Sequence, residues 1–179
     1  MKGISYKQRI CNDKERIDRF LIEKRVGSLG MSDKSKPYTI PVNYVFLNGK
    51  IYIHGLGTGR KNHILRENAH VCFTVFEELG TVKSSVPCKC DTSYFSVVIF
   101  GKAMLVEDPN EKIEALGKFL EKFTPGLFDK NVLKQVVERY HSSLNNKAVS
   151  VYCICPEHLT AKENPVDMNH MFTAIEKMR

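Results

Sequence analysis

The chain has 179 residues, of which 42% are hydrophobic and 26% are charged, so it is long enough to bury its own core as one domain or one domain plus a tail. This composition excludes a disordered or fibrous protein. The formal net charge of +7 points to a polyanion, an acidic surface or a phosphorylated small molecule, without selecting one. Because the sequence lacks a run of about 18 apolar residues and an apolar signal-peptide core, a cytoplasmic protein with reduced cysteines is expected.

The N-terminal segment predicts a helix and a strand. Asn12 or Asp13 can cap a helix that ends near Gly27. Its apolar stripe has the spacing i, i+3, i+4 and consists of Ile17, Phe20 and Leu21. A short strand is expected over residues 28–31, and a turn over 34–37.

The strongest local signal is a β-hairpin. Two β-rich runs, 38–47 and 50–54, flank the pair Asn48-Gly49, which is typical of a type I′ turn. Pro41 lacks a backbone N–H, so the first of these strands is an edge or bulged at that point.

The middle of the chain predicts a glycine-rich turn, a short helix and two strands. Glycines break the second hairpin strand, and a helix over 60–68 follows. A strand over 70–76, an irregular segment over 77–92 and a long strand over 94–106 come next. Gly101 indicates a bend in that long strand.

The C-terminal part predicts helices and a last strand. Asp108-Pro109-Asn110-Glu111 combines an N-cap, a proline at the first helical position and an acidic residue at the third. A further helix is expected over roughly 129–142, and a strand over 148–155 that Pro156 ends. The tail has apolar residues at helical spacing: Met168, Met171, Phe172, Ile175 and Met178.

These elements amount to about six or seven strands and three or four helices. Strands separated by turns rather than by regular crossover helices favour an α+β, mainly β protein with an antiparallel barrel, and a doubly wound sheet is the alternative.

The segment from Tyr52 to His63 is the densest candidate site. A strand enters a glycine-rich turn, and Arg60 and Lys61 stand where a helix begins. Exposed N–H groups, a helix N-terminus and fixed positive charge form an anion site, most naturally for a phosphate. The alternative is a mobile loop with solvated charges, because short glycine-rich motifs have many false positives.

The six cysteines do not predict a metal site. Cys88-x-Cys90 and Cys153-x-Cys155 are spaced more closely than structural zinc knuckles. Cys153 and Cys155 are expected to be buried strand thiols, and Cys88 and Cys90 loop thiols. No catalytic triad context occurs, and the scattered cations do not predict nucleic-acid binding.

A family resemblance rests on four segments around the glycine-rich turn: 38–45, 48–55, 59–61 and 68–73. Further matches lie at 94–103, in the helix containing Glu111, and at Thr160-x-Lys162. Together these segments resemble the pyridoxamine 5′-phosphate oxidase-like flavin-binding split barrels, and most of all their 5-nitroimidazole resistance (nitroimidazole reductase) branch. The likeness covers roughly residues 9–162, so a split-barrel domain over 1–162 and a helical tail over 163–179 are expected.

The resemblance implies a six-stranded split β-barrel with flanking helices, which pairs as a homodimer and holds FMN in clefts at the subunit interface. It assigns the phosphate to Arg60 and Lys61, and the ribityl and ring edge to His54 and Gly55. It assigns the remaining cofactor contacts to Pro41, Val42, Asn43, Tyr44, Ser96 and Val97.

The implied function is an oxidoreductase that passes electrons from NADH or NADPH to a small planar acceptor such as a 5-nitroimidazole. His54 is the candidate catalytic residue, with a structural role as the alternative. The other functions left open are a non-catalytic flavin- or haem-binding protein, with His54 or His63 as iron ligands, and pyridoxamine 5′-phosphate oxidase-like activity. The sequence lacks the longer C-terminal segment with an Arg-x-His signature that is typical of the true oxidases.

Overall fold

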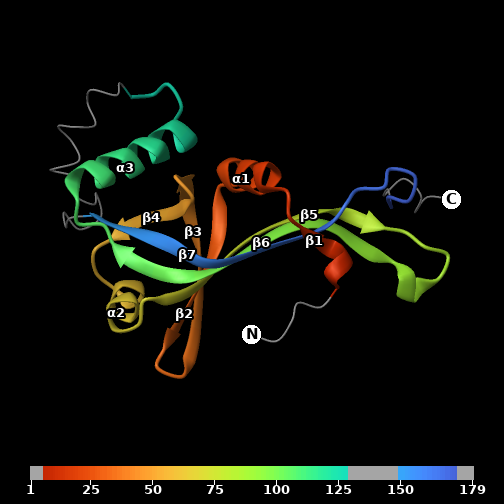
Figure 1. Ribbon diagram of the computed structural model, residues 1–179, viewed down its shortest axis with the longest axis horizontal. Helices are drawn as coiled ribbons and strands as arrows, with labels where there is room; N and C mark the ends of the chain where they lie inside the picture. The colour runs from red at the N-terminus through yellow and green to blue at the C-terminus, as the bar shows by residue number, and fades with distance from the viewer. Residues whose placement is uncertain (1–5, 129–148, 173–179) are drawn as a thin grey trace.

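The computed structural model describes residues 6–128 and 149–172 (Figure 1). Within these residues, no helix has the length and apolar character that crossing a membrane requires. The helices are α1 (Lys14–Glu23), α2 (Arg60–Glu67) and α3 (Pro109–Phe123), with short 3-10 helices η1 (Lys7–Arg9) and η2 (Pro87–Lys89). The strands are β1 (Ile10–Cys11), β2 (Val26–Asp33), β3 (Lys36–Leu47), β4 (Lys50–Leu56), β5 (His70–Val82), β6 (Asp91–Leu105) and β7 (Val149–Asn164). The helix expected over 129–142 lies outside the described residues.

The strands form one antiparallel sheet that closes on itself. Their order is β1-β7-β4-β3-β2-β5-β6, and β6 also pairs with β7. Six strands therefore make a ring, and the two-residue β1 is added at the edge of β7 through Ile10 and Cys11. The expected α+β, mainly β class and the six-stranded split barrel are both confirmed.

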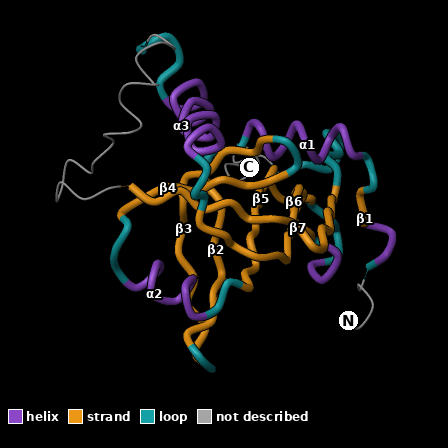
Figure 2. The backbone as a smooth tube through the Cα atoms, turned by 60° about the vertical axis from the view of Figure 1, so that its left-hand side comes forward, coloured by secondary structure: helices purple, strands orange, loops and turns teal. Residues whose placement is uncertain are grey.

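Two apolar clusters stabilise this ring. The larger fills its interior and includes residues from α1 and α2, with Leu21, Leu29, Phe73 and Ile99 fully buried. The smaller lies outside the ring, where α3 covers β3, β4 and β7. In both views α1 and α3 lie above the strands, and α2 lies at the lower left (Figures 1 and 2).

Several local predictions are confirmed. Asp13 caps α1 by accepting a hydrogen bond from the backbone N–H of Arg16. Asp108 caps α3 and accepts from the N–H groups of Asn110 and Glu111. The β3–β4 turn has positive φ at both Asn48 and Gly49, as a type I′ turn requires.

Four expectations differ from the structure. The first helix, α1, ends at Glu23 rather than near Gly27, which is part of β2. The segment 77–92 is not irregular throughout, because β5 extends to Val82 and β6 begins at Asp91; the pair reaches the right-hand end of Figure 1. Pro156 does not end β7, because it pairs with Gly101 beside a bulge that absorbs one extra residue. The described part of the tail is not helical: after β7 it makes a turn, and Met171 bridges to Val82.

Candidate functional site

The ring is split between β3 and β4. These strands pair only over Tyr44–Leu47 and Lys50–Ile53. Before Tyr44, β3 pairs with β2 alone, and after Ile53, β4 pairs with β7 alone. Asn43 and His54 are thus the first positions beyond the shared ladder, one on each lip of the split. As the sequence predicts, β3 is an edge strand at Pro41.

The predicted residues of β3 alternate between the two faces of the sheet, because strand side chains have a period of two. Pro41 and Asn43 are exposed, whereas Val42 packs against the interior cluster and Tyr44 is fully buried. Only Pro41 and Asn43 therefore offer side chains to an external ligand. Val42 and Tyr44 can offer a ligand at the lip only their backbone groups.

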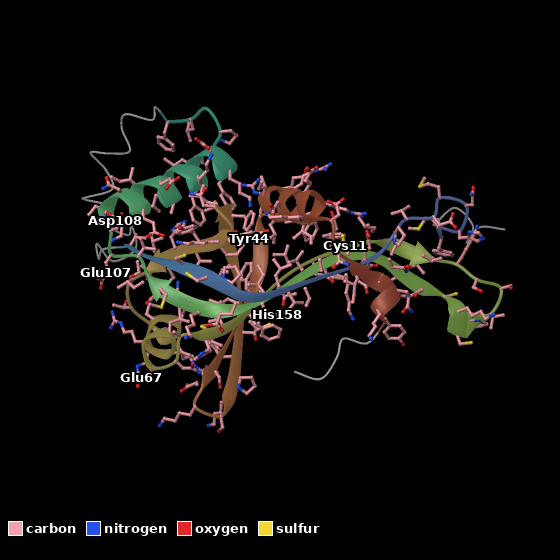
Figure 3. All side chains as sticks on the ribbon, viewed as in Figure 1. Cys11, Tyr44, Glu67, Glu107, Asp108 and His158 are labelled. Atoms are coloured by element: carbon pink, nitrogen blue, oxygen red, sulfur yellow. The ribbon has the colours of Figure 1, made fainter. Side chains whose placement is uncertain are left out.

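Tyr44 is a core residue rather than a surface contact. Its ring meets Phe73 edge to face at a centroid distance of 5.1 Å, and Lys122 Nζ lies 4.3 Å from its ring centroid. Figure 3 shows Tyr44 on β3 below α1 and α3. Burial raises the pKa of its phenol, and among the described residues its hydroxyl has no hydrogen-bond partner. It therefore remains neutral within the barrel.

His54 lies on the outer face of β4, against α3. Its imidazole meets Phe119 edge to face at a centroid distance of 4.3 Å. Partial burial, and secondarily the charge of Lys61, lower the pKa of His54 below its ordinary value of 6.5. The imidazole is consequently held neutral at physiological pH, a form with one donor nitrogen and one acceptor nitrogen.

Arg60 begins α2 and stands beside the β2–β3 hairpin. Gly59 precedes it as the N-cap with φ of 100°, a conformation that glycine adopts without strain. The guanidinium lies 4.4 Å from the ring centroid of Tyr38, and its Nη2 is 3.5 Å from Asp33 Oδ2. This long, exposed ion pair leaves most of the donors of the guanidinium available to a ligand.

Lys61 is a half-buried cation without an acidic partner among residues 6–128 and 149–172. Its Nζ covers Gly55 and lies 6.0 Å from the ring centroid of Tyr152. Burial lowers the pKa of this ammonium, because desolvation penalises the charged form. An anion bound beside it would offset that penalty.

Asn62, to which sequence analysis gave no role, is the most buried polar residue of α2. Its Nδ2 donates hydrogen bonds of 2.6 Å to the carbonyl of Leu56 and 2.7 Å to that of Thr58. The side chain therefore ties the glycine-rich loop to the helix that follows it. The only sequence signal was an amide residue in the first turn after the glycines.

Ser96 and Val97, on β6, lie apart from the predicted site residues of β3, β4 and α2. Val97 is fully buried in the barrel, and Ser96 is half-buried on the outer face. That face is connected by a row of paired residues: Pro41, Ser28, Thr74 and Val98. Along the curved sheet, three strand spacings, about 14 Å, lie between Pro41 and Val98, which is the next outer-face residue after Ser96 on β6. The structure thus brings together the predicted residues of β3, β4 and α2, but not those of β6.

The cysteines behave as free thiols. Cys153 Sγ and Cys155 Sγ are 3.7 Å apart on β7, and burial raises the pKa of Cys153 to about 12. Cys88 and Cys90 are exposed at the end of the β5–β6 hairpin. Within the described part of the chain, no group of three or more metal-ligating side chains occurs.

A cavity of about 540 Å³ lies elsewhere, between α1, β1 and β7. Its lining is mainly apolar and includes Ile17, Phe46 and Leu159, with Lys14, Asp18 and His158 among its polar residues. It contains none of the predicted site residues.

Comparisons with known proteins agree with this fold. A family model described as pyridoxamine 5′-phosphate oxidase matches residues 13–163. A comparison with curated protein sequences found no match.

Solved structures are similar over most of the chain. A candidate 5-nitroimidazole antibiotic resistance protein from Bacteroides thetaiotaomicron VPI-5482 is 25% identical, with a TM-score of 0.66 over 86% of this chain and 85% of its own. The flavocytochrome Anf3 from Azotobacter vinelandii is 22% identical, with a TM-score of 0.73 over 94% of this chain and 77% of its own. An FAD and heme binding protein from Mycobacterium smegmatis is 17% identical, with a TM-score of 0.71 over 95% of this chain and 78% of its own. At these low identities, the last two structures show only that the fold is shared.

Proposed function

The chain belongs to the pyridoxamine 5′-phosphate oxidase family, and we propose that it is an oxidoreductase that binds FMN at the split between β3 and β4. The observation that carries this proposal is the half-buried ammonium of Lys61. It lies beside a glycine-rich loop and a helix N-terminus, and no described carboxylate neutralises it. Such an arrangement suits a phosphate.

The donor set fits a terminal phosphate. Arg60 supplies a planar guanidinium for bidentate hydrogen bonds, and Lys61 supplies a point charge from the other side of the loop. Two cations balance one phosphate dianion. A bare glycine at position 55 leaves the space that the Lys61 ammonium occupies.

The lips of the split suit the ring of the cofactor. The outer edge of β3 before Tyr44 has backbone groups that no neighbouring strand pairs, and Pro41 and Asn43 are exposed there. When bound, FMN supplies the hydride and electron transfer. The residues of this chain orient it, and His54, held neutral, offers a polar contact to an acceptor near the β4 lip.

The proposed reaction transfers electrons from NADH or NADPH to a small planar acceptor of the 5-nitroimidazole type. The likeness to the Bacteroides protein supports this acceptor class. A neutral imidazole beside the site can donate a hydrogen bond to a nitro group.

We further propose that two chains form the complete site. The outer face of β2, β5 and β6 exposes large apolar side chains, with Val26 exposed by 53%, Phe76 by 57% and Phe100 by 40%. Ser96 lies on this same face, directly opposite Phe76 in the ladder. A second copy packed on the face would bury these side chains and bring its own Ser96 towards the first copy's split.

A spectrum of the purified protein, followed by FMN titration, tests the proposal. We expect flavin absorption that denaturation releases, or uptake of added FMN, and then NADH- or NADPH-dependent reduction of a 5-nitroimidazole. A protein that takes up no FMN would overturn flavin binding, and a sharp haem band would favour a haem protein. Flavin binding without turnover with either donor would overturn the reaction but not the cofactor.

A further inference from the structure

We infer that Asn62 is the positioning residue that holds the glycine-rich loop in its anion-binding shape, an inference that rests on the proposed function. The segment from Gly55 to Gly59, which is the end of β4 and the loop after it, has few side chains of its own to fix it. Its conformation must therefore be fixed by the elements that flank it.

The geometry of Asn62 meets this need. The residue is only 2% exposed, and Nδ2 donates both of its hydrogens, one to Leu56 O and one to Thr58 O. These carbonyls belong to the end of β4 and to the middle of the loop. One rigid amide in α2 thus joins the strand, the loop and the helix.

The two bonds also orient the rest of the loop. Carbonyls that bond to Asn62 point towards α2, so the N–H groups of the loop are left for another acceptor. The residue directly before Asn62 is Lys61, whose ammonium covers Gly55. Fixing the helix against the loop therefore fixes the cation as well.

Burial makes this bond pair costly to lose. Asn62 Oδ1 is buried without a hydrogen-bond partner among the described residues, so the amide carries the cost of an unsatisfied acceptor while its Nδ2 makes both bonds. The opposite amide orientation would set Oδ1 against two carbonyl oxygens, and so the observed one is required. Because these two bonds fix the loop that carries the proposed anion site, the amide is expected to contribute to the site as well as to stability.

The test compares Asn62→Ala with Asn68→Ala. Asn68 is the C-cap at the other end of α2, and its Oδ1 accepts a hydrogen bond from the backbone N–H of His70 and lies 3.2 Å from His70 Nδ1. It is the same residue type, placed directly after the last residue of the same helix and away from the loop. Asn62→Ser, which keeps one donor, covers the case in which Asn62→Ala fails to fold.

The first readout needs no ligand. Hydrogen exchange of the backbone amides over residues 55–61 should be about tenfold faster or more in Asn62→Ala and unchanged in Asn68→Ala. The second readout compares dissociation constants for FMN and riboflavin, which differ by the phosphate. Asn62→Ala should lose about tenfold or more in FMN affinity but little in riboflavin affinity.

The outcomes separate the two proposals. A wild-type protein that shows no preference for FMN over riboflavin would overturn the phosphate site itself. A wild-type preference that survives in Asn62→Ala, or unchanged exchange in the loop, would overturn the role of Asn62 alone. Equal losses in Asn62→Ala and Asn68→Ala would show that α2 stability, rather than loop position, is responsible, and would also overturn it.

Discussion

Lys61 covers Gly55: a Cβ added to Gly55 would lie 2.9 Å from Lys61 Nζ. This distance is shorter than real Cβ contacts, so any side chain at position 55 has to displace the ammonium. We expect Gly55→Ala to weaken FMN binding about tenfold, because a charge-assisted hydrogen bond contributes about 1.5–3 kcal/mol and would be partly lost. Flavin fluorescence titration measures the change.

Lys61→Met is the companion variant, and Lys118→Met is its control. Lys118 is an exposed lysine of α3 that pairs with Glu121. Lys61→Met should weaken FMN binding at least as much as Gly55→Ala, with riboflavin binding little changed. FMN binding that is equal in Lys61→Met and Lys118→Met would contradict the phosphate assignment.

His54 should make stability depend on pH. Its pKa is lowered in the folded protein, so the unfolded chain takes up the proton first as the pH falls below the ordinary value of 6.5. Stability from this group is therefore complete above that value and declines as the pH falls through it towards the folded pKa. Between about pH 7.5 and about pH 5.5, wild type should lose more free energy of unfolding than His54→Gln.

Urea denaturation of both proteins at the two pH values measures this difference. The other histidines are common to both proteins, so their contribution cancels in the comparison. If the two proteins lost the same free energy of unfolding, His54 would not be held neutral by its surroundings.

Gly101 should be far less tolerant of substitution than Gly49. A Cβ at Gly101 would lie 2.1 Å from the Cys155 carbonyl oxygen, at the bulge where β6 pairs with Pro156. Gly101→Ala should therefore destabilise the protein by about 3 kcal/mol. Gly49→Ala meets no atom within 4 Å and should lose only about 1 kcal/mol, from its positive φ. Similar unfolding midpoints for the two variants would contradict the close approach.

Phe76 should report on the proposed second copy. It is exposed on the outer sheet face, at a centroid distance of 6.1 Å from Tyr94. Phe76→Glu should leave the core intact but put a charge into the interface, which favours monomers and weakens FMN binding. Analytical ultracentrifugation measures the shift, with Ile22→Glu on exposed α1 as the control. A wild-type monomer that binds FMN fully would overturn the two-chain site.

Local elements were predictable wherever a specific residue fixes the backbone. Asp13 and Asp108 are N-caps, and Asn48-Gly49 makes the type I′ turn. These signals act over a few residues and need no knowledge of the rest of the fold. The clustering of the β3, β4 and α2 site residues likewise follows from a hairpin and the loop directly after it.

The features that escaped prediction depend on partners distant in the sequence. The sequence predicts that Pro156 ends the last strand, yet β7 continues through it. The bulge opposite Gly101 interrupts the ladder there, so a backbone N–H from residue 156 is not needed. The segment 77–82 carries two glutamates and a glycine, and it is a strand because β6 pairs with it. The inward direction of Tyr44 depends on the register of the whole ring.

The closure of the ring has a consequence for how the protein is made. The last strand, β7, pairs with β4 at Ile51 and Ile154, which are 103 positions apart (154 − 51), and also completes the ladder with β6. Until β7 has been synthesised, β4 and β6 both expose unpaired edges, and non-local pairing of this kind is slow. The barrel therefore cannot close until the chain up to Asn164 has left the ribosome, and chaperones that shield strand edges would act before that point.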